Sequence, residues 1–281
     1  MKDTIMFSGT SHTLGLGLEW ELHPEFNSEE YLQKGVFLPV KRTKELDENY
    51  WRKYRWSALV CKELGYNEYN VHNVENNALV IGDNMPFMMH LYHRRNEDKI
   101  KELIDRTKYI VLEMGYSRWW EQKIHGQPGG ENLPNTPKEI ENYINSKTAD
   151  RAVVDAAIKW VLDYDNQRNA LWAEAYDKII KFNKEFPDIQ FIIVPWKGQL
   201  PDDFYTIFND IKDWFIKIDG KHGSTVEEYL MENELYVFHK AKAFNGNYYY
   251  NERDDHACVE GHRKVADMVI EHIKELENKT I

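Results

Sequence analysis

The residues with types and spacing suited to chemistry stand at the two ends of the chain. Near the N-terminus, Thr4 to Gly17 reads TIMFSGTSHTLGLG, in which a short apolar run is followed by small residues and by Ser11. This order is typical of a buried strand that delivers a serine to a tight turn. A serine hydroxyl is a weak nucleophile and needs a neighbouring base together with a group that orients the base. We therefore take Ser11 as the candidate nucleophile.

A candidate base and a candidate acid lie near the other end of the chain. Asp254, Asp255 and His256 stand together in RDDHACVEGHRKVAD, just before a predicted amphipathic helix. Loops at the carboxyl ends of parallel strands gather in one crevice, so Ser11 and His256 would meet if both loops lie at that edge. Only one of two adjacent aspartates can face the imidazole, and we favour Asp254. Helix capping is the alternative role for Ser11 and for the aspartates, and it is compatible with catalysis.

Apolar runs and helical spacing predict an α/β fold around a parallel sheet. The alternation of strands and helices is typical of right-handed crossovers between parallel strands. Strands are predicted at 4–8, 68–74, 109–114 and 190–195, with a fifth at either 214–218 or 235–238. Helices are predicted at 47–64, 85–106, 137–147, 149–163, 166–186, 204–211 and 259–277. Because the sequence contains no repeat and no linker, we predict one domain over 1–281, with glycines and prolines marking an inserted loop or lid at about 121–136.

Composition narrows the class of protein. The formal net charge is -11 and no long basic run is present, which disfavours nucleic acid as a partner. Apolar segments are too short to span a bilayer, and the N-terminus lacks the apolar core of a signal peptide. The two cysteines, Cys61 and Cys258, form neither a disulfide framework nor a zinc pattern. We expect a cytoplasmic protein, and the serine chemistry considered above needs no metal and no organic cofactor.

On these residues the chain resembles the SGNH, or GDSL-type, hydrolase family. GTSHTLGLG is similar to the nucleophile block of that family, with Thr10 where the family commonly has Asp, and DDHACVEGH is similar to its closing block. The resemblance implies a flavodoxin-like, three-layer α/β/α sandwich with a parallel five-stranded sheet. It also implies ester hydrolysis or acyl transfer by a triad of Ser11, His256 and Asp254. The short Asp-x-His spacing is similar to that of phage-encoded members.

The middle of the chain departs from the pattern of the family. Where the second block supplies a glycine to the oxyanion hole, the chain has ENN at 75–77. Where the third block reads Gly-x-Asn-Asp, the chain reads GYSR at 115–118. Backbone N–H groups and polar side chains can both stabilise an oxyanion. The candidate donors are Gly15, Asn76, Asn77 and Ser117.

Candidate substrate-binding residues are His12, Arg118, Trp119 and Trp196. The planar guanidinium of Arg118 could clamp a carboxylate or a phosphate, and an internal salt bridge is the equally weighted alternative. The tryptophans could form a sugar-stacking or acyl-binding wall, or they could cover the core. Glu113, within an apolar predicted strand, is expected either to pair with such an arginine or to lie close to the pocket.

The leading hypothesis is a serine esterase or acyltransferase that acts on a small or carbohydrate-type O-acyl ester. One alternative is an SGNH-fold protein with weakened catalysis that binds a small anionic or sugar ligand. Another is an enzyme that acts on a phosphate-bearing nucleotide or sugar read by Arg118. No membrane association is expected, and the sequence leaves the oligomeric state open.

Overall fold

The computed structural model describes just over half of the chain. The described residues are 2–9, 11–15, 18–22, 47–70, 95–115, 176–177, 179–197, 206, 208–237, 241–242, 248–249 and 256–279, and at Ser11 and His12 only the backbone is described. The chain divides into two compact units, Met1–Tyr116 with Ile179–Ile281, and Ser117–Lys178. Nearly all described elements belong to the first unit. The predicted loop or lid at 121–136 lies outside the described residues, and the single domain over 1–281 stays a prediction.

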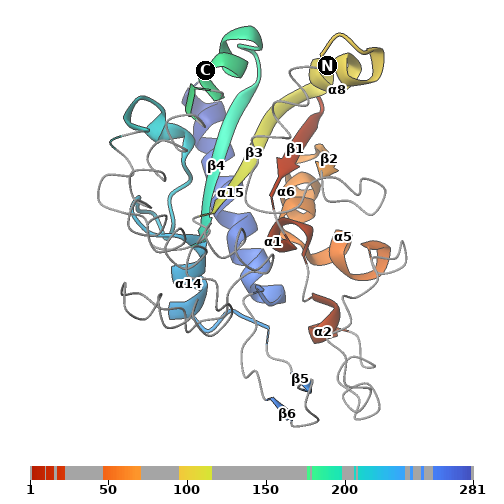
Figure 1. The fold of residues 1–281 in the computed structure, drawn as a ribbon, viewed down its shortest axis with the longest axis vertical. Helices are drawn as coiled ribbons and strands as arrows, with labels where there is room; N and C mark the ends of the chain where they lie inside the picture. The colour runs from red at the N-terminus through yellow and green to blue at the C-terminus, as the bar shows by residue number, and fades with distance from the viewer. Residues whose placement is uncertain are drawn as a thin grey trace, which may run out of the picture. The chain divides into compact units, whose positions relative to one another are not determined.

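A parallel sheet of four described strands organises the first unit (Figure 1). The strands stand in the order β2-β1-β3-β4, and β1 pairs in parallel with β2 on one side and β3 on the other. Their bounds are β1 Thr4–Ser8, β2 Asn67–Asn70, β3 Thr107–Gly115 and β4 Gln190–Lys197. All five residues of β1 are buried, as expected for an interior strand of a parallel sheet. The predicted α/β class and the first strand's central place are confirmed.

The edge of the sheet beyond β4 carries one further contact. Phe215 forms a parallel bridge with Ile193, and the Ile216 N–H donates to the Ile193 carbonyl at 3.0 Å. Of the two segments proposed for a fifth strand, 214–218 is therefore the one that lies beside β4. Tyr236, from the other segment, instead bridges Ala257 in the antiparallel sense. The five-stranded sheet stays a prediction, and the short antiparallel pair of β5 (Ala241–Lys242) and β6 (Tyr248–Tyr249) forms a separate sheet.

The predicted continuous helix over 47–64 is wrong, because the chain breaks at Arg55. A π-helical turn, η2 (Asp47–Trp51), leads into α5 (Arg52–Tyr54), and α6 (Trp56–Leu64) follows. Arg55 between them is extended, with φ -65° and ψ 143°. Helical spacing could not anticipate the break, since Arg55 is 1% exposed and binds Glu68 of the next strand.

The remaining helices agree with the sequence in part. Of the helix predicted at 85–106, residues 95–97 are not helical and α8 begins at Asp98, while 85–94 lie outside the described residues; a 3₁₀ turn stands near the helix predicted at 204–211. Residues 179–185, inside the helix predicted at 166–186, are helical. The last helix is confirmed. Their bounds are α1 Ser11–Leu14, α2 Leu18–Leu22, α8 Asp98–Arg106, η3 Asn209–Trp214, α14 Val226–Glu232 and α15 Val259–Lys279.

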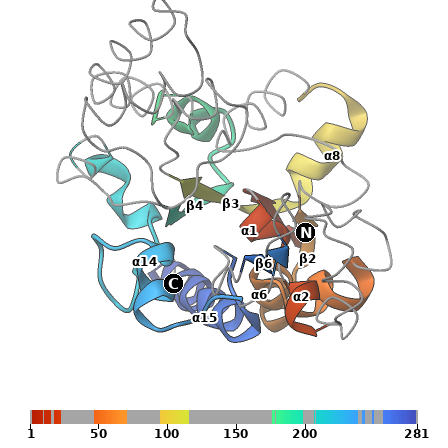
Figure 2. The ribbon, with the colours of Figure 1, turned by 60° about the horizontal axis from the view of Figure 1, so that its bottom comes forward.

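Helical residues cover both faces of the sheet. On one face α6 and α15 pack together, as Figure 2 shows, and their apolar side chains join those of β1, β3 and β4 in the main core. On the other face Phe182, from the helical residues 179–185, contacts Phe191 of β4 edge-on, with 5.6 Å between the ring centroids. Neighbouring residues of a strand point to opposite faces, so Phe191 and Ile192 of β4 belong to different layers. The complete three-layer sandwich stays a prediction.

Candidate functional site

Ser11 begins α1 directly beyond the carboxyl end of the central strand. β1 ends at Ser8, and α1 spans Ser11–Leu14. On one side of β1, β2 ends at Asn70. On the other side, Leu112 of β3 pairs with Ser8, and Glu113 follows it. Ligand sites of parallel sheets form at this edge. The strand-to-turn placement predicted for Ser11 is therefore confirmed at the level of the backbone.

The segment that carries Ser11 packs against the segment that carries His256. Leu14, three residues after Ser11, is buried in a small apolar cluster with Trp51, and Val259, three residues after His256, packs against the same cluster. Glu21 of α2 accepts a hydrogen bond from the Val259 N–H at 2.7 Å. The two end blocks of the sequence therefore lie in one part of the fold.

His256 occupies a buried position just before α15. Its side chain is close to fully buried, and its carbonyl accepts from the Val237 N–H at 2.9 Å. Cys258, two residues on, accepts from the Gly261 N–H at 3.3 Å, and burial raises the pKa of its thiol. A thiol that keeps its proton is a poor nucleophile. Cys258 is a partly buried thiol that packs against the main core.

Glu113 lies against Gly9 and the first residues of α1, which together are called the Ser11 turn, and its predicted pairing with an arginine or place near a pocket stays a prediction. Its side chain is 3% exposed, and Oε2 accepts from the Thr13 N–H at 3.1 Å and from the Thr13 hydroxyl at 2.5 Å. A Cβ at Gly9 would lie 2.5 Å from Glu113 Oε2, so any larger residue at this position would clash with the carboxylate. Because Glu113 engages the Thr13 N–H, that group is not available to an oxyanion.

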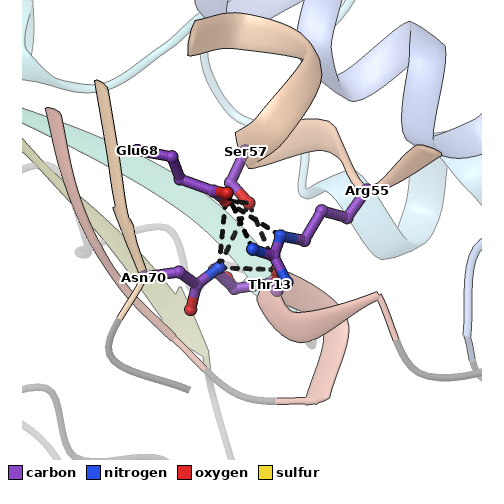
Figure 3. A network of polar contacts seen from close by, with 5 residues as sticks. All are labelled: Thr13, Arg55, Ser57, Glu68 and Asn70. Atoms are coloured by element: carbon purple, nitrogen blue, oxygen red, sulfur yellow. Dashed lines mark hydrogen bonds and ion pairs between the residues drawn. The ribbon is translucent and has the colours of Figure 1, made fainter. Parts of the chain in front are cut away.

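The other side of Thr13 is held by a polar network shown in Figure 3. Asn70 Nδ2 donates to the Thr13 carbonyl at 3.2 Å and to Ser57 Oγ at 3.1 Å. Ser57 has one hydroxyl hydrogen, and its 2.6 Å contact to Glu68 takes precedence over the 3.4 Å contact to the same carbonyl. Arg55 binds Glu68 in a bidentate pair, at 2.9 and 2.7 Å. The network fixes Asn70, which in turn fixes the Thr13 carbonyl.

A second buried histidine lies beside this network. His262 of α15 is fully buried, and its Nδ1 accepts from the Trp56 N–H at 3.3 Å. Burial lowers the pKa of His262 to about 3, with smaller contributions from His256 and Arg55. An imidazole that accepts at Nδ1 is neutral and carries its hydrogen on Nε2. His262 is therefore uncharged at neutral pH.

The structure also decides the surroundings of two predicted site residues. Gly15 closes α1 with φ +89°, and a Cβ there would lie 2.8 Å from Arg55 Cβ, so backbone and packing both require glycine. Its role as an oxyanion donor stays a prediction. Trp196 is 1% exposed and stacks on Trp56 at 6.0 Å. Trp196 thus serves the core, the alternative that the sequence left open, rather than a wall of the site.

The other predicted site residues lie outside the described part of the chain. These are Asn76, Asn77, Ser117, Arg118, Trp119 and Asp254, with Asp255. Among the described residues no group of three or more His, Cys, Asp and Glu side chains is placed to hold a metal ion. No helix in that same part of the chain is long and apolar enough to cross a bilayer.

Of the residues that hold Thr13, sequence reasoning singled out Glu113 and not Asn70. The signal for Glu113 was a charged residue within an apolar predicted strand. That signal identifies a polar residue that needs a partner. It does not identify the partner, which comes from another element in each case.

Comparisons with known proteins add little to this geometry. No protein-family model matches the chain, and a search of curated proteins gives no match. Among solved structures the chain is similar to a family two carbohydrate esterase from Clostridium thermocellum in complex with cellohexaose, at 10% identity and a TM-score of 0.35. The alignment covers 99% of this chain, which spans 65% of the other. At this level the similarity establishes neither a shared fold nor a shared activity.

Proposed function

We propose that the chain is a serine esterase or acyltransferase that acts on a small or carbohydrate-type O-acyl ester. The observation that carries the proposal is the packing of the two end blocks. Glu21, ten residues after Ser11, binds Val259 although the two are 238 positions apart. The same contact region includes Leu14, so the Ser11 turn and the His256 segment approach each other from opposite ends of the sequence.

The chemistry follows from the roles of the three triad residues. Ser11 Oγ attacks the ester carbonyl while His256 accepts the hydroxyl proton, which it then gives to the departing alcohol. Asp254 orients the imidazole and stabilises its protonated form. Water, or an acceptor alcohol in a transferase, then attacks the acyl-enzyme by the same route and releases Ser11. The oxyanion is held by donors other than the Thr13 N–H, which Glu113 engages.

Three features of the described residues support this assignment. The Ser11 backbone stands at the carboxyl end of the central strand, where sites of parallel sheets form. His256 is buried just before α15 and so is shielded from bulk water. Cys258, the other nucleophile of the closing block, has a pKa raised by burial and does not compete.

Covalent labelling with a fluorophosphonate tests the nucleophile directly. Wild type is expected to be labelled at Ser11 and to release acetate from aryl acetates and acetylated sugars. Ser11→Ala should lose labelling and slow hydrolysis by about 1,000-fold or more, because triad members act as a unit. Ser224→Ala, at an exposed serine, is the matched control and should retain both. Asp254→Asn should lose far more activity than Asp255→Asn.

The opposite outcome favours the binding protein. If Ser11 stays unlabelled in folded protein and Ser11→Ala hydrolyses esters at the background rate of wild type, esterase activity is excluded. Thermal shift against sugars and small anions then identifies a ligand, because a compound that binds the native state raises the melting temperature by mass action.

A further inference from the structure

We propose that Glu113 is the positioning residue of the nucleophile turn, and that its buried carboxylate serves as the N-terminal cap of α1. The inference rests on the proposed function in one respect only, the role of Ser11 in that turn. The contact itself is shown by the structure, since Glu113 Oε2 accepts from both the N–H and the hydroxyl of Thr13.

The register of the sheet brings Glu113 to this place. Leu112 of β3 pairs with Ser8 of β1, so Glu113 stands one residue beyond the last paired residue of β1. Gly9 is the next residue of the chain there, and its lack of a Cβ lets the carboxylate approach the turn. A carboxylate at this point of β3 therefore meets the first turn of α1.

The need for such a partner follows from the length of α1. A helix of four residues makes almost no internal hydrogen bonds, and the N–H groups of its first turn need outside acceptors. Most helices obtain one from a Ser, Thr, Asp or Asn at the N-cap. A negative charge is also stabilising at the N-terminus of a helix, where the helix dipole is positive. Glu113 fulfils both requirements from another element.

Thr13 is held on all three of its polar groups. Its N–H and hydroxyl bind Glu113, while its carbonyl accepts from Asn70, which the Arg55–Glu68 pair and Ser57 support. Thr13 is two residues from Ser11, so the position of the nucleophile depends on this clamp. A displacement of about 1 Å at a reacting group can slow a reaction about 100-fold.

The chain contains a matched control for this contact. Glu228 Oε2 accepts from the N–H and the hydroxyl of Thr225, at 2.8 and 3.2 Å, at the start of α14. The two pairs share residue types, donors and acceptor atom. They differ in place, since α14 carries none of the proposed triad residues.

The experiment compares Glu113→Ala, Glu113→Gln and Glu228→Ala in the full chain. Glu113→Ala should lower both kcat and the rate of fluorophosphonate labelling by about 100-fold, while KM changes by less than about threefold, because the defect concerns the nucleophile and not substrate binding. Glu113→Gln keeps an acceptor oxygen and should recover most of the rate. Glu228→Ala should lower the melting temperature and leave kcat unchanged. Equal loss of rate in Glu113→Ala and Glu228→Ala would overturn the inference.

Hydrogen exchange separates this inference from the esterase proposal. In Glu113→Ala the amide of Thr13 should exchange faster than in wild type, whether or not the protein hydrolyses esters. Unchanged exchange there would overturn the inference even in an active enzyme, and an unlabelled Ser11 with faster exchange would overturn only the esterase proposal. If Glu113→Ala does not fold, Thr13→Val provides a second test, because it removes the hydroxyl that donates to Glu113. It should slow labelling of Ser11 about tenfold. Labelling of Thr13→Val at the wild-type rate would overturn the inference.

Discussion

Two glutamates of this protein make the same contact in two ways. At α14, Glu228 binds Thr225, three residues before it, in a capping box in which the Thr225 hydroxyl also accepts from the Glu228 N–H. At α1, Glu113 binds Thr13 across 100 positions of the sequence. The first cap forms whenever the local turn forms. The second exists only after β3 has paired with β1.

The cap of α1 depends on contacts between distant elements, whereas the cap of α14 is local. Long-range contacts form only once the chain has closed the intervening loop, at a cost in entropy. The described contacts of Thr13 with Glu113 and Asn70 therefore come from neighbouring strands of the sheet. Disturbing the sheet edge or its polar network should loosen α1, whereas α14 should keep its cap.

Removing the carboxylate that supports the Thr13 carbonyl is expected to have the largest effect. Glu68→Ala leaves the Arg55 guanidinium, which is 2% exposed, without its bidentate partner. The free energy of unfolding should fall by about 4 kcal/mol, as for other broken buried pairs. Glu63→Ala, which removes a partner of the far more exposed Arg263, should cost less than about 1 kcal/mol. Urea denaturation of both variants measures the contrast, and equal losses would contradict it.

A methyl group inserted between Thr13 and Glu113 is expected to cause the second largest loss of stability. Gly9→Ala places a Cβ against the Thr13 hydroxyl and Glu113, and we expect a loss of about 3 kcal/mol from overpacking. Gly65→Ala meets nothing within 4 Å and should cost about 1 kcal/mol, from its left-handed backbone alone. Thermal denaturation of the pair checks the difference. A Gly9→Ala protein as stable as wild type would show that the turn does not depend on this approach.

The free energy of unfolding is expected to decrease at acid pH, in part through His262. Burial lowers the pKa of His262 to about 3 and that of His272 to about 4, both below the ordinary value of 6.5. The unfolded chain then binds more protons than the native state, so stability is complete above about pH 6.5 and falls as the pH decreases toward these values. Each histidine contributes at most about 1.4 kcal/mol per pH unit. Protonation also ends the acceptance of the Trp56 N–H by His262 Nδ1.

Denaturant titrations between pH 7 and pH 5 measure this dependence. His262→Asn should reduce the slope of stability against pH by less than half, because His272 and His222, whose pKa values burial also lowers, remain. A slope unaffected by both His262→Asn and His272→Asn would contradict the assignment of the acid sensitivity to these two side chains.

The smallest expected effect compares the two threonines directly. Thr225→Val removes an N-cap acceptor and should cost about 1 kcal/mol. Thr13→Val removes a donor to a buried carboxylate and should cost somewhat more, about 2 kcal/mol. Ester hydrolysis should separate them more sharply than stability, since only Thr13 borders the Ser11 turn. Equal activity in the two variants would show that the contact of Thr13 with Glu113 does not contribute to catalysis.

The elements that sequence reasoning predicted share one property, a local signal. The buried run at β1, the apolar run at β4 and the amphipathic α15 were all recognised from neighbouring residues, because burial on both faces makes a strand a continuous apolar run and burial on one face gives a helix a period of 3.6. The Thr225-x-x-Glu228 spacing is a local signal of the same kind, although we predicted no helix there. Arg55 could not be placed in this way, since its helical spacing concealed a bend decided by Glu68.

The α/β class, the interior strand that leads to Ser11 and the segment of His256 before the last helix could be predicted from the sequence, because apolar patterns and the order of chemical groups are written along the chain. What holds the nucleophile turn followed only from the folded arrangement of the elements. Glu113 of β3 and Asn70 of β2 reach Thr13 through the parallel pairing of the strands, and Arg55, between α5 and α6, binds Glu68 beside Asn70. Partners so far apart in sequence leave no periodic trace, since their proximity depends on register, and register is a property of the folded sheet.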